Sequence, residues 1–229
     1  MFLFFTDQIH DNTLILVGDE HQHCTTVLRK KLGDQLFITE GKGRIYTAEI
    51  SNISKNQTEC NILSVESKAP PTTALAIAIA PTKNASRIEW FVEKAIEIGI
   101  SGLYFIHTAR TEKKNINLNR IHKIAIAAMK QSLNVHLPQI MVFDKLKDFY
   151  LYSASKYEEK FIAHCDLPGQ MLPISIEKNA ILMIGPEGDF TPQEISDAIQ
   201  KNYIAVSLGS SRLRTETAGL VGLMRMKLN

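Results

Sequence analysis

Two glycine-bearing stretches near the end of the chain each follow a short apolar run and carry charged side chains. Residues 185–190 read Gly-Pro-Glu-Gly-Asp-Phe after the apolar run 180–184, and residues 209–218 follow the run 204–208. In an open α/β sheet, ligands bind at the carboxyl ends of the strands. Loops after two neighbouring strands would therefore form one small-molecule pocket. It would be lined by backbone amide and carbonyl groups, a carboxylate and two guanidinium groups.

The first stretch has the composition of a rigid turn that a ligand can approach closely. Gly185 and Gly188 remove side chains from the turn, and Pro186 fixes the backbone between them. Residues 191–194, Thr-Pro-Gln-Glu, then predict a helix start with an N-cap threonine, a proline at N1 and a glutamate at N3. The spacing matches neither GxxxxGK[ST] nor GxGxxG, so phosphate binding is not the leading inference. The alternative is a tight strand-to-helix turn without a ligand.

The second stretch places two arginines and a glutamate just beyond a strand end. Arg212 and Arg214 suit a carboxylate, a phosphate or a base edge, and Glu216 follows them. The alternative is a solvated helix start with a surface ion pair. The small residues Ala218, Gly219 and Gly222 then recur at helical spacing and would let another segment pack closely against this helix. That segment could belong to the core of the same chain or to a second copy of it.

The elements that must position these loops fall into two regions of the chain: a β-rich N-terminal region and an α/β region that follows it. Short β-rich runs at residues 13–17, 35–39, 44–50 and 58–65 predict a small barrel. A helix is expected near residues 19–30, capped by Asp19, with Val27 and Leu28 facing inward. Residues 67–73 contain two prolines and read as a linker.

Beyond the linker, strands alternate with helices. The apolar run 74–80 is typical of a strand buried on both faces. Helices are expected at 86–98, which Gly99 ends, and at 119–132. The other expected strands are 103–106, 140–143, 161–163, 181–184 and 204–208. This alternation predicts an α/β unit with a mostly parallel sheet covered on both faces.

Composition excludes several classes. The chain has 229 residues, is 45% hydrophobic and 22% charged, and carries a formal net charge of +2, which is ordinary for one large or two smaller globular domains. No apolar run reaches the ~20 residues of a membrane span, and the first residues lack a basic leader. We expect a cytoplasmic protein with reduced thiols at Cys24, Cys60 and Cys165. His21, His23 and Cys24 lack a second ligand pair, so no metal is expected.

The N-terminal part is locally basic. Arg29, Lys30 and Lys31, with Lys42 and Arg44, would suit RNA phosphates. The alternative is that these side chains, which lie near turns, are solvated and bind no partner.

Four stretches together resemble the SPOUT family of S-adenosylmethionine-dependent RNA methyltransferases. They are residues 23–34, 93–99, 184–190 and 213–218. The match is to the RsmE-type branch, which methylates N3 of a uridine in 16S ribosomal RNA of the small subunit. The resemblance implies a PUA-like, RNA-binding β-barrel at 1–68 and an α/β methyltransferase domain at 74–229. It also implies a trefoil knot in the second domain and a homodimer formed through it.

The resemblance also implies roles for individual residues. S-adenosylmethionine would bind Ile184, Gly185, Glu187, Gly188, Leu208, Gly209, Leu213, Thr217 and Ala218. Arg214 and Glu216 would lie near the uracil, where Glu187 or Glu216 accepts the N3 proton and Arg214 holds a carbonyl oxygen. RNA would contact Arg29, Lys30, Lys31, Arg44 and Arg212.

The chain departs from the family pattern at three places. Asp189 and Lys130 stand where many relatives have Gly and Glu, and Ser211-Arg212 replaces the usual Arg-Ile. The last change leaves open whether Arg212 or Arg214 meets the target base. Two other functions remain alternatives: a non-catalytic, ribosome-associated RNA-binding module, and a nucleotide-binding α/β enzyme unrelated to methyl transfer.

Overall fold

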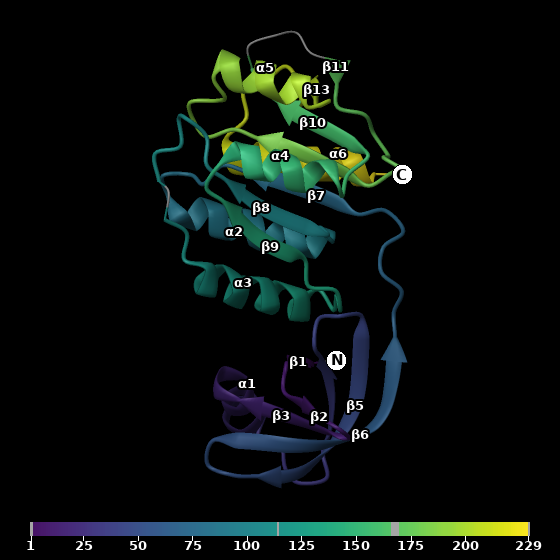
Figure 1. Cartoon of the computed structure of the whole chain (residues 1–229). Coiled ribbons are helices and arrows are strands. Elements are labelled where there is room, and N and C mark those ends of the chain that lie inside the picture. The colour runs from purple at the N-terminus through teal and green to yellow at the C-terminus, as the bar shows by residue number, and fades with distance from the viewer. Residues whose placement is uncertain (1, 114, 166–169, 229) are drawn as a thin grey trace. The chain divides into compact units, whose positions relative to one another are not determined.

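The computed structural model describes residues 2–113, 115–165 and 170–228. The chain forms two compact units, which are considered separately. The N-terminal unit comprises Met1–Pro70 with Ile126–Leu137, and the C-terminal unit comprises Pro71–Ala125 with Pro138–Asn229. Figure 1 follows the chain from its purple N-terminus to its yellow C-terminus.

The N-terminal unit is built on a six-stranded sheet among its described residues. Its strands are β1 (Leu3–Phe5), β2 (Ile9–His10), β3 (Thr13–Val17), β4 (Gln35–Thr39), β5 (Arg44–Ile53) and β6 (Gln57–Ser67). They are ordered β1-β4-β5-β6-β3-β2; β1 pairs with β4 in parallel, and the other pairs are antiparallel. Alternate residues enter one core, among them Leu14, Leu16, Leu36 and Ile38. The strands expected at 13–17 and 35–39 are confirmed, whereas β1 and β2 were not foreseen.

The helix that interrupts these strands differs from the prediction. α1 (Gly18–Gln22) runs into a π-helical turn, η1 (His23–Val27). The N-cap residue is Val17, with no side-chain cap, so the expected cap at Asp19 is wrong. Val27 is 66% exposed, which also contradicts its expected inward position, whereas Leu28 packs against the core. A π turn holds more residues than an α turn, so side-chain positions counted with a 3.6-residue period end on the wrong face.

The C-terminal unit has a seven-stranded sheet among its described residues, and all its pairings are parallel, as predicted. Its strands are β7 (Leu75–Ile79), β8 (Gly102–Ile106), β9 (Gln139–Phe143), β10 (Glu159–Ala163), β11 (Gln170–Met171), β12 (Ala180–Ile184) and β13 (Ile204–Ser207). The order is β11-β13-β10-β12-β7-β8-β9. The strands before the two glycine-bearing loops are therefore not neighbours, because β10 lies between them.

Helices cover both faces of this sheet (Figure 1). They are α2 (Ala85–Ile98), α3 (Leu118–Gln131), α4 (Leu146–Ala154), α5 (Pro192–Gln200) and α6 (Thr215–Lys227), of which α4 was not foreseen. α3 is divided between the two units after Ala125. α6 packs against α2, β7 and β12. A Cβ at Gly219 would come within 2.5 Å of Phe91, and one at Gly222 would collide with Leu182, so these small residues serve core packing.

Local sequence sets the helix ends near the site. α5 has the predicted capping box: the Thr191 hydroxyl accepts from the Glu194 amide, and the Glu194 carboxylate accepts from the Thr191 amide. α2 begins with Asn84 as N-cap and ends at Gly99, whose φ is +92°.

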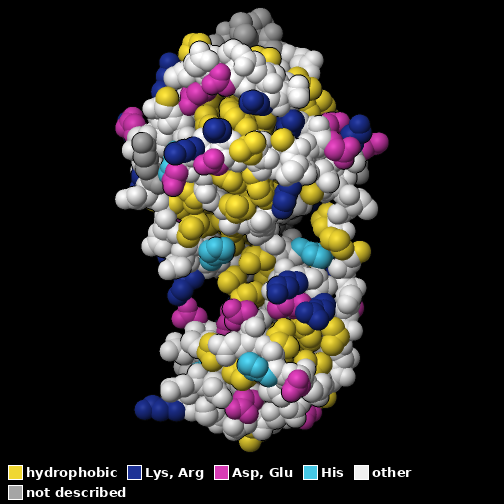
Figure 2. Space-filling view, viewed as in Figure 1, with side chains coloured by type: hydrophobic (Ala, Val, Ile, Leu, Met, Phe, Trp, Pro, Cys, Tyr) yellow, Lys and Arg dark blue, Asp and Glu magenta, His cyan; other side chains and the backbone are white. Residues whose placement is uncertain are grey.

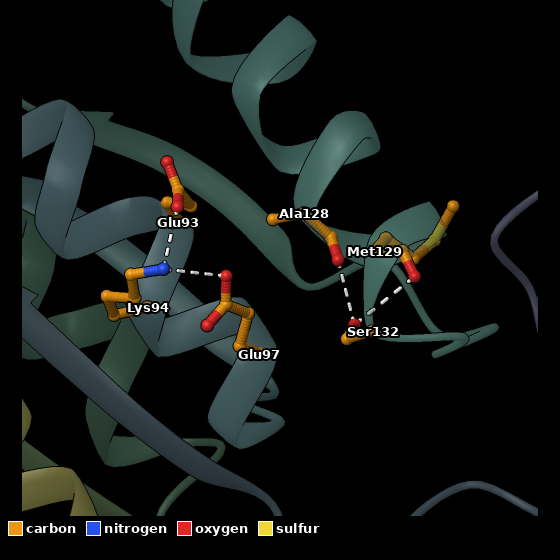
Figure 3. Close-up of polar contacts among 6 residues, drawn as sticks. All are labelled: Glu93, Lys94, Glu97, Ala128, Met129 and Ser132. Atoms are coloured by element: carbon orange, nitrogen blue, oxygen red, sulfur yellow. Dashed lines mark hydrogen bonds and ion pairs between the residues drawn. The ribbon is translucent and has the colours of Figure 1, made fainter.

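Residues 93–99, one of the family-like segments, and the end of α3 have simple structural roles (Figure 3). On α2, Lys94 donates to Glu93 at 2.7 Å and to Glu97 at 2.9 Å. Near the end of α3, the Ser132 hydroxyl donates to the carbonyls of Ala128 and Met129, which caps the last turn. On the face shown in Figure 2, acidic and basic side chains are interspersed, with hydrophobic ones exposed between them.

Candidate active site

A cavity of about 830 Å³ lies at the carboxyl ends of the parallel strands of the C-terminal unit. Its lining comes from the segments after β10, β12 and β13, with Arg87 from α2 and Arg110 from the loop after β8. We call it the strand-end cavity. Its volume is within the usual range for small-molecule sites, roughly 300–1,000 Å³.

Residues 185–190 form one wall, which is held by a hydrogen bond within the turn and by bonds from two neighbouring loops. The Asp189 amide donates to the Pro186 carbonyl at 2.9 Å and closes the turn. The Arg110 guanidinium donates to the Gly188 carbonyl at 2.7 Å. The Glu187 carboxylate accepts from the Lys83 amide at 3.1 Å. The last two bonds come from the loops after β8 and β7, so the turn is fixed before any ligand binds.

Asp189 explains one departure from the family pattern. Its φ is +62°, in the left-handed region that favours glycine. Its carboxylate accepts two backbone hydrogen bonds, from Phe190 at 2.7 Å and from Cys165 at 2.8 Å. The aspartate thus offsets its backbone strain and ties the loop after β12 to the loop after β10.

Residues 207–214 form the opposite wall. Gly209 has φ +143°, and a Cβ there would meet open space, so the backbone rather than crowding favours glycine. Leu208 and Leu213 are half-buried and add apolar surface to the lining. The buried Thr215 hydroxyl donates to the Gly185 carbonyl at 3.1 Å, which joins this wall to the first.

The lining is rich in guanidinium groups. It includes Arg87, Arg110, Arg212 and Arg214, of which Arg212 and Arg214 are exposed. Glu216 is 6% exposed and does not line the cavity. Its Oε1 lies 3.7 Å from Nε of Arg87, and its buried Oε2 has no hydrogen-bond partner among the described residues. This carboxylate therefore faces Arg87 rather than the cavity.

The structure brings together most of the residues named from the sequence. The cavity lining contains Ile184, Gly185, Glu187, Gly188, Leu208, Gly209, Leu213, Ala218, Arg212 and Arg214. Thr217, on the first turn of α6, does not line it, and neither does Glu216. Lys83 pairs with Glu112 at 2.8 Å and is also outside the lining.

Sequence reasoning overlooked the segment after β10. His164 and Cys165 line the cavity directly after β10, which ends at Ala163. Ligands bind at the carboxyl ends of strands here too, but only the strand order shows that β10 lies between β12 and β13.

The basic residues predicted to bind RNA differ in their surroundings within the N-terminal unit. Arg29 and Lys31 are exposed, and Lys30 is half-buried. Arg44 lies 2.6 Å from the buried carboxylate of Glu40 and 5.5 Å from the centre of the Tyr46 ring. The bond to Glu40 raises the pKa of Arg44 and offsets its charge.

Residues 2–113, 115–165 and 170–228 hold neither a metal-binding cluster nor a membrane-spanning helix. No three His, Cys, Asp or Glu side chains there are grouped so as to hold a metal ion. In that part of the chain, no helix combines the length and the apolar character needed to cross a membrane.

A cavity at the carboxyl ends of a parallel sheet is the usual ligand site of an α/β enzyme, and its guanidinium groups suit phosphates and nucleic acids. A family model described as "RNA methyltransferase domain" matches residues 68–227, and one described as "RNA methyltransferase PUA domain" matches residues 17–63. The chain therefore belongs to the RNA methyltransferase family, with a PUA-like N-terminal unit and a C-terminal α/β unit of the SPOUT type, as predicted.

Named relatives and solved structures agree with this family. The "Ribosomal RNA small subunit methyltransferase E" of Rickettsia conorii is 28% identical over 99% of this chain and 94% of its own length. A crystal structure of a probable rRNA-methyltransferase from Porphyromonas gingivalis is 34% identical, covers 98% of each chain and has a TM-score of 0.88. A methyltransferase structure from Legionella pneumophila, in complex with the bound cofactor SAM, is 26% identical over 97% and 95% of the chains, with a TM-score of 0.85.

Proposed function

We propose that this protein transfers a methyl group from S-adenosylmethionine to N3 of a uridine in small-subunit ribosomal RNA. The observation that carries the proposal is the strand-end cavity, which joins two glycine-bearing walls and presents Arg212 and Arg214 to solvent. The names of the relatives, which match nearly the whole chain, support the rRNA substrate.

The residues present fit a nucleoside cofactor. The cavity volume is sufficient, and Ile184, Leu208 and Leu213 give an apolar lining beside exposed backbone. At Gly185 a Cβ would lie 3.2 Å from Oδ1 of Asp189, so a side chain there would crowd the turn that forms the wall. When bound, S-adenosylmethionine supplies a methyl group on a sulfonium, which is a reactive electrophile.

Because the electrophile is already reactive, the chain must chiefly position the uracil and manage its N3 proton. The chain would hold the uracil so that N3 faces the methyl group of the cofactor in a near-attack arrangement. Glu187 is the better placed of the two predicted bases: it lines the cavity, and the Lys83 amide occupies Oε1, which leaves Oε2 for a proton. Glu216 is buried beside Arg87, which suits it to holding that guanidinium.

Arg214 is assigned to the uracil oxygen that gains negative charge as the proton leaves. It is exposed at the cavity, one residue before α6 begins. A guanidinium in that place stabilises the developing anion. The uridine must be unpaired, since N3 faces the partner base in a duplex.

The two parts of the chain would divide the work. We assign RNA binding to residues 1–68, through Arg29, Lys30 and Lys31, and methyl transfer to residues 74–229. A ribosomal RNA substrate would place the enzyme in the cytoplasm.

We also infer a homodimer formed through the C-terminal unit, with its last segment threaded as a trefoil knot. On that unit, Trp90 of α2 is 46% exposed and Met224 of α6 is 37% exposed, although the two helices pack together. Light scattering coupled to size-exclusion chromatography would give twice the 25.7 kDa chain mass. A monomer at micromolar concentration would contradict this inference.

The direct test of the reaction is mass mapping of 16S ribosomal RNA from cells that lack the gene. We expect one uridine to lose a base methyl group and to regain it when the wild-type gene is restored. A gene that encodes the Arg214→Ala variant should not restore it. An unchanged methylation pattern would favour the non-catalytic RNA-binding module.

A further inference from the structure

Among the described residues, His164 is the buried polar side chain at the strand-end cavity whose bonding is least complete. It follows β10 directly, is 8% exposed and is one of the lining residues. Neither of its ring nitrogens has a hydrogen-bond partner among the described residues, and each exposes less than 1 Å². A buried polar group without a partner destabilises the folded state. Such a residue weakens the fold unless a ligand completes its bonding.

The strand order explains why a ligand would meet this residue. β10 lies between β12 and β13, the strands that lead into the two walls. The residue that follows β10 therefore lies between residues 185–190 and residues 207–214. The Asp189 carboxylate holds the adjacent Cys165 amide at 2.8 Å, which fixes the backbone beside His164.

We propose that His164 hydrogen-bonds to S-adenosylmethionine bound in the strand-end cavity, an inference that rests on the proposed function. A neutral imidazole offers one donor and one acceptor. The ribose hydroxyls and the adenine edge of the cofactor offer the complementary groups. Both ring nitrogens are buried in the structure, and His164 lines the cavity. A rotation of the side chain would bring one of them to the ligand, and the new bond would offset the cost of the rotation.

The chain offers a matched control in His107. It follows β8 as His164 follows β10, its side chain is 7% exposed, and its Nε2 also lacks a partner among the described residues. His107 does not line the cavity, and its Nδ1 lies 3.1 Å from Asp144. Both histidines thus share burial and a strand-end position, and they differ in access to the ligand.

The experiment combines calorimetric titration with thermal unfolding of the full-length protein. His164→Phe and His164→Leu should each weaken the binding of S-adenosylmethionine and S-adenosylhomocysteine about tenfold, the effect of losing about 1.4 kcal/mol. Without ligand, their melting temperatures should equal or exceed that of the wild type, because apolar side chains remove unpaired nitrogens. His107→Phe should leave both affinities unchanged. In the wild type, the ¹⁵N resonances of the His164 ring should move when S-adenosylhomocysteine saturates the protein.

Each outcome bears on the proposal. Wild-type affinity in both His164 variants would overturn it and leave the proposed function intact. A lower melting temperature in both variants, with ring resonances that do not respond to ligand, would show a packing role and also overturn it. If the wild type itself failed to bind S-adenosylmethionine, this inference and the proposed function would fall together.

Discussion

At the scale of single residues, two arginines are candidates for the contact to the target base. Arg212 and Arg214 are both exposed and both line the strand-end cavity. Arg214 is the N-cap residue of α6, and the Thr215 hydroxyl that follows it is bonded to the Gly185 carbonyl. The backbone of Arg214 is therefore fixed relative to the cofactor wall. This favours Arg214 for a contact that must form in the transition state.

We therefore expect Arg214→Ala to lower kcat by roughly 10²–10³-fold, the loss typical of an electrostatic contact to a developing anion. The dissociation constant of S-adenosylmethionine should change by less than about threefold, since the contact is with the base. Single-turnover kinetics and calorimetry separate the two effects. Arg212→Ala is the comparison and should mainly raise the KM for RNA. Equal losses of turnover and cofactor affinity in Arg214→Ala would show that Arg214 only builds the cavity wall.

At the scale of elements, the loop after β12 depends on Asp189. The left-handed φ of +62° favours glycine, and the two carboxylate hydrogen bonds favour aspartate. Asp189→Ala loses the bonds and keeps the strain, so it should lower the free energy of unfolding by about 2–3 kcal/mol. Asp189→Gly loses the bonds but relieves the strain and should be about 1 kcal/mol less destabilised than the alanine variant.

Urea unfolding of the three proteins tests this order of stability. Asp189→Asn provides a further control, because asparagine tolerates the left-handed region and can still accept hydrogen bonds. The account of the loop would be wrong if the alanine and glycine variants were equally stable.

The turn after η1 carries the basic residues that are most available to RNA. Arg29 and Lys31 are exposed, whereas the charge of Arg44 is offset by buried Glu40. When one fewer phosphate is neutralised, the slope of log affinity against log salt becomes shallower by about 0.7–0.9. Arg29→Ala and Lys31→Ala should each show this change in filter-binding titrations, and Arg44→Ala should show a smaller one. A larger effect for Arg44→Ala would move the RNA-binding surface to the β4–β5 hairpin.

Elements with local signals were predictable from the sequence, and elements without them were not. The start of α5 was read from residues 191–194, and β3 and β4 match the predicted bounds. β1 was missed because the short apolar run at its site has no alternation, and α4 was missed because its first turn has no side-chain cap to mark it. The position of His164 at the cavity could not be predicted, because the position of β10 in the sheet depends on pairings between segments far apart in the chain.

At the scale of the whole molecule, buried ionisable side chains link stability to alkaline pH. Burial raises the pKa of Cys60 to about 12 and that of Tyr157 to about 12, and it also raises the pKa values of Tyr150 and Tyr203. In the unfolded chain, the pKa is about 8.5 for cysteine and about 10 for tyrosine. The folded state favours the protonated forms, so their contribution to stability is complete below about pH 8.5 and is lost as pH rises toward about 12.

The urea concentration at the unfolding midpoint should therefore fall steadily between about pH 9 and about pH 11. The fall should be larger than the one that lysine deprotonation alone causes. Tyr157→Phe removes one of these groups and should make the fall shallower. Its hydroxyl bond to Tyr104 at 2.7 Å is also removed, so the variant begins from a lower midpoint at neutral pH. An identical pH slope in the wild type and the variant would contradict the role given to burial.

The central claim concerns the strand-end cavity, and calorimetric titration of the wild-type protein tests it most directly. S-adenosylmethionine, ATP and NAD are each titrated in separate runs into the wild-type protein and into the Gly185→Val variant. The valine places a branched side chain in the wall of the cavity. We predict that S-adenosylmethionine alone binds, at one site per chain, and that the variant loses this binding while it keeps the folded circular-dichroism spectrum. Binding of ATP or NAD instead, or an unchanged affinity for S-adenosylmethionine in the folded variant, would contradict the claim that this cavity holds the methyl donor.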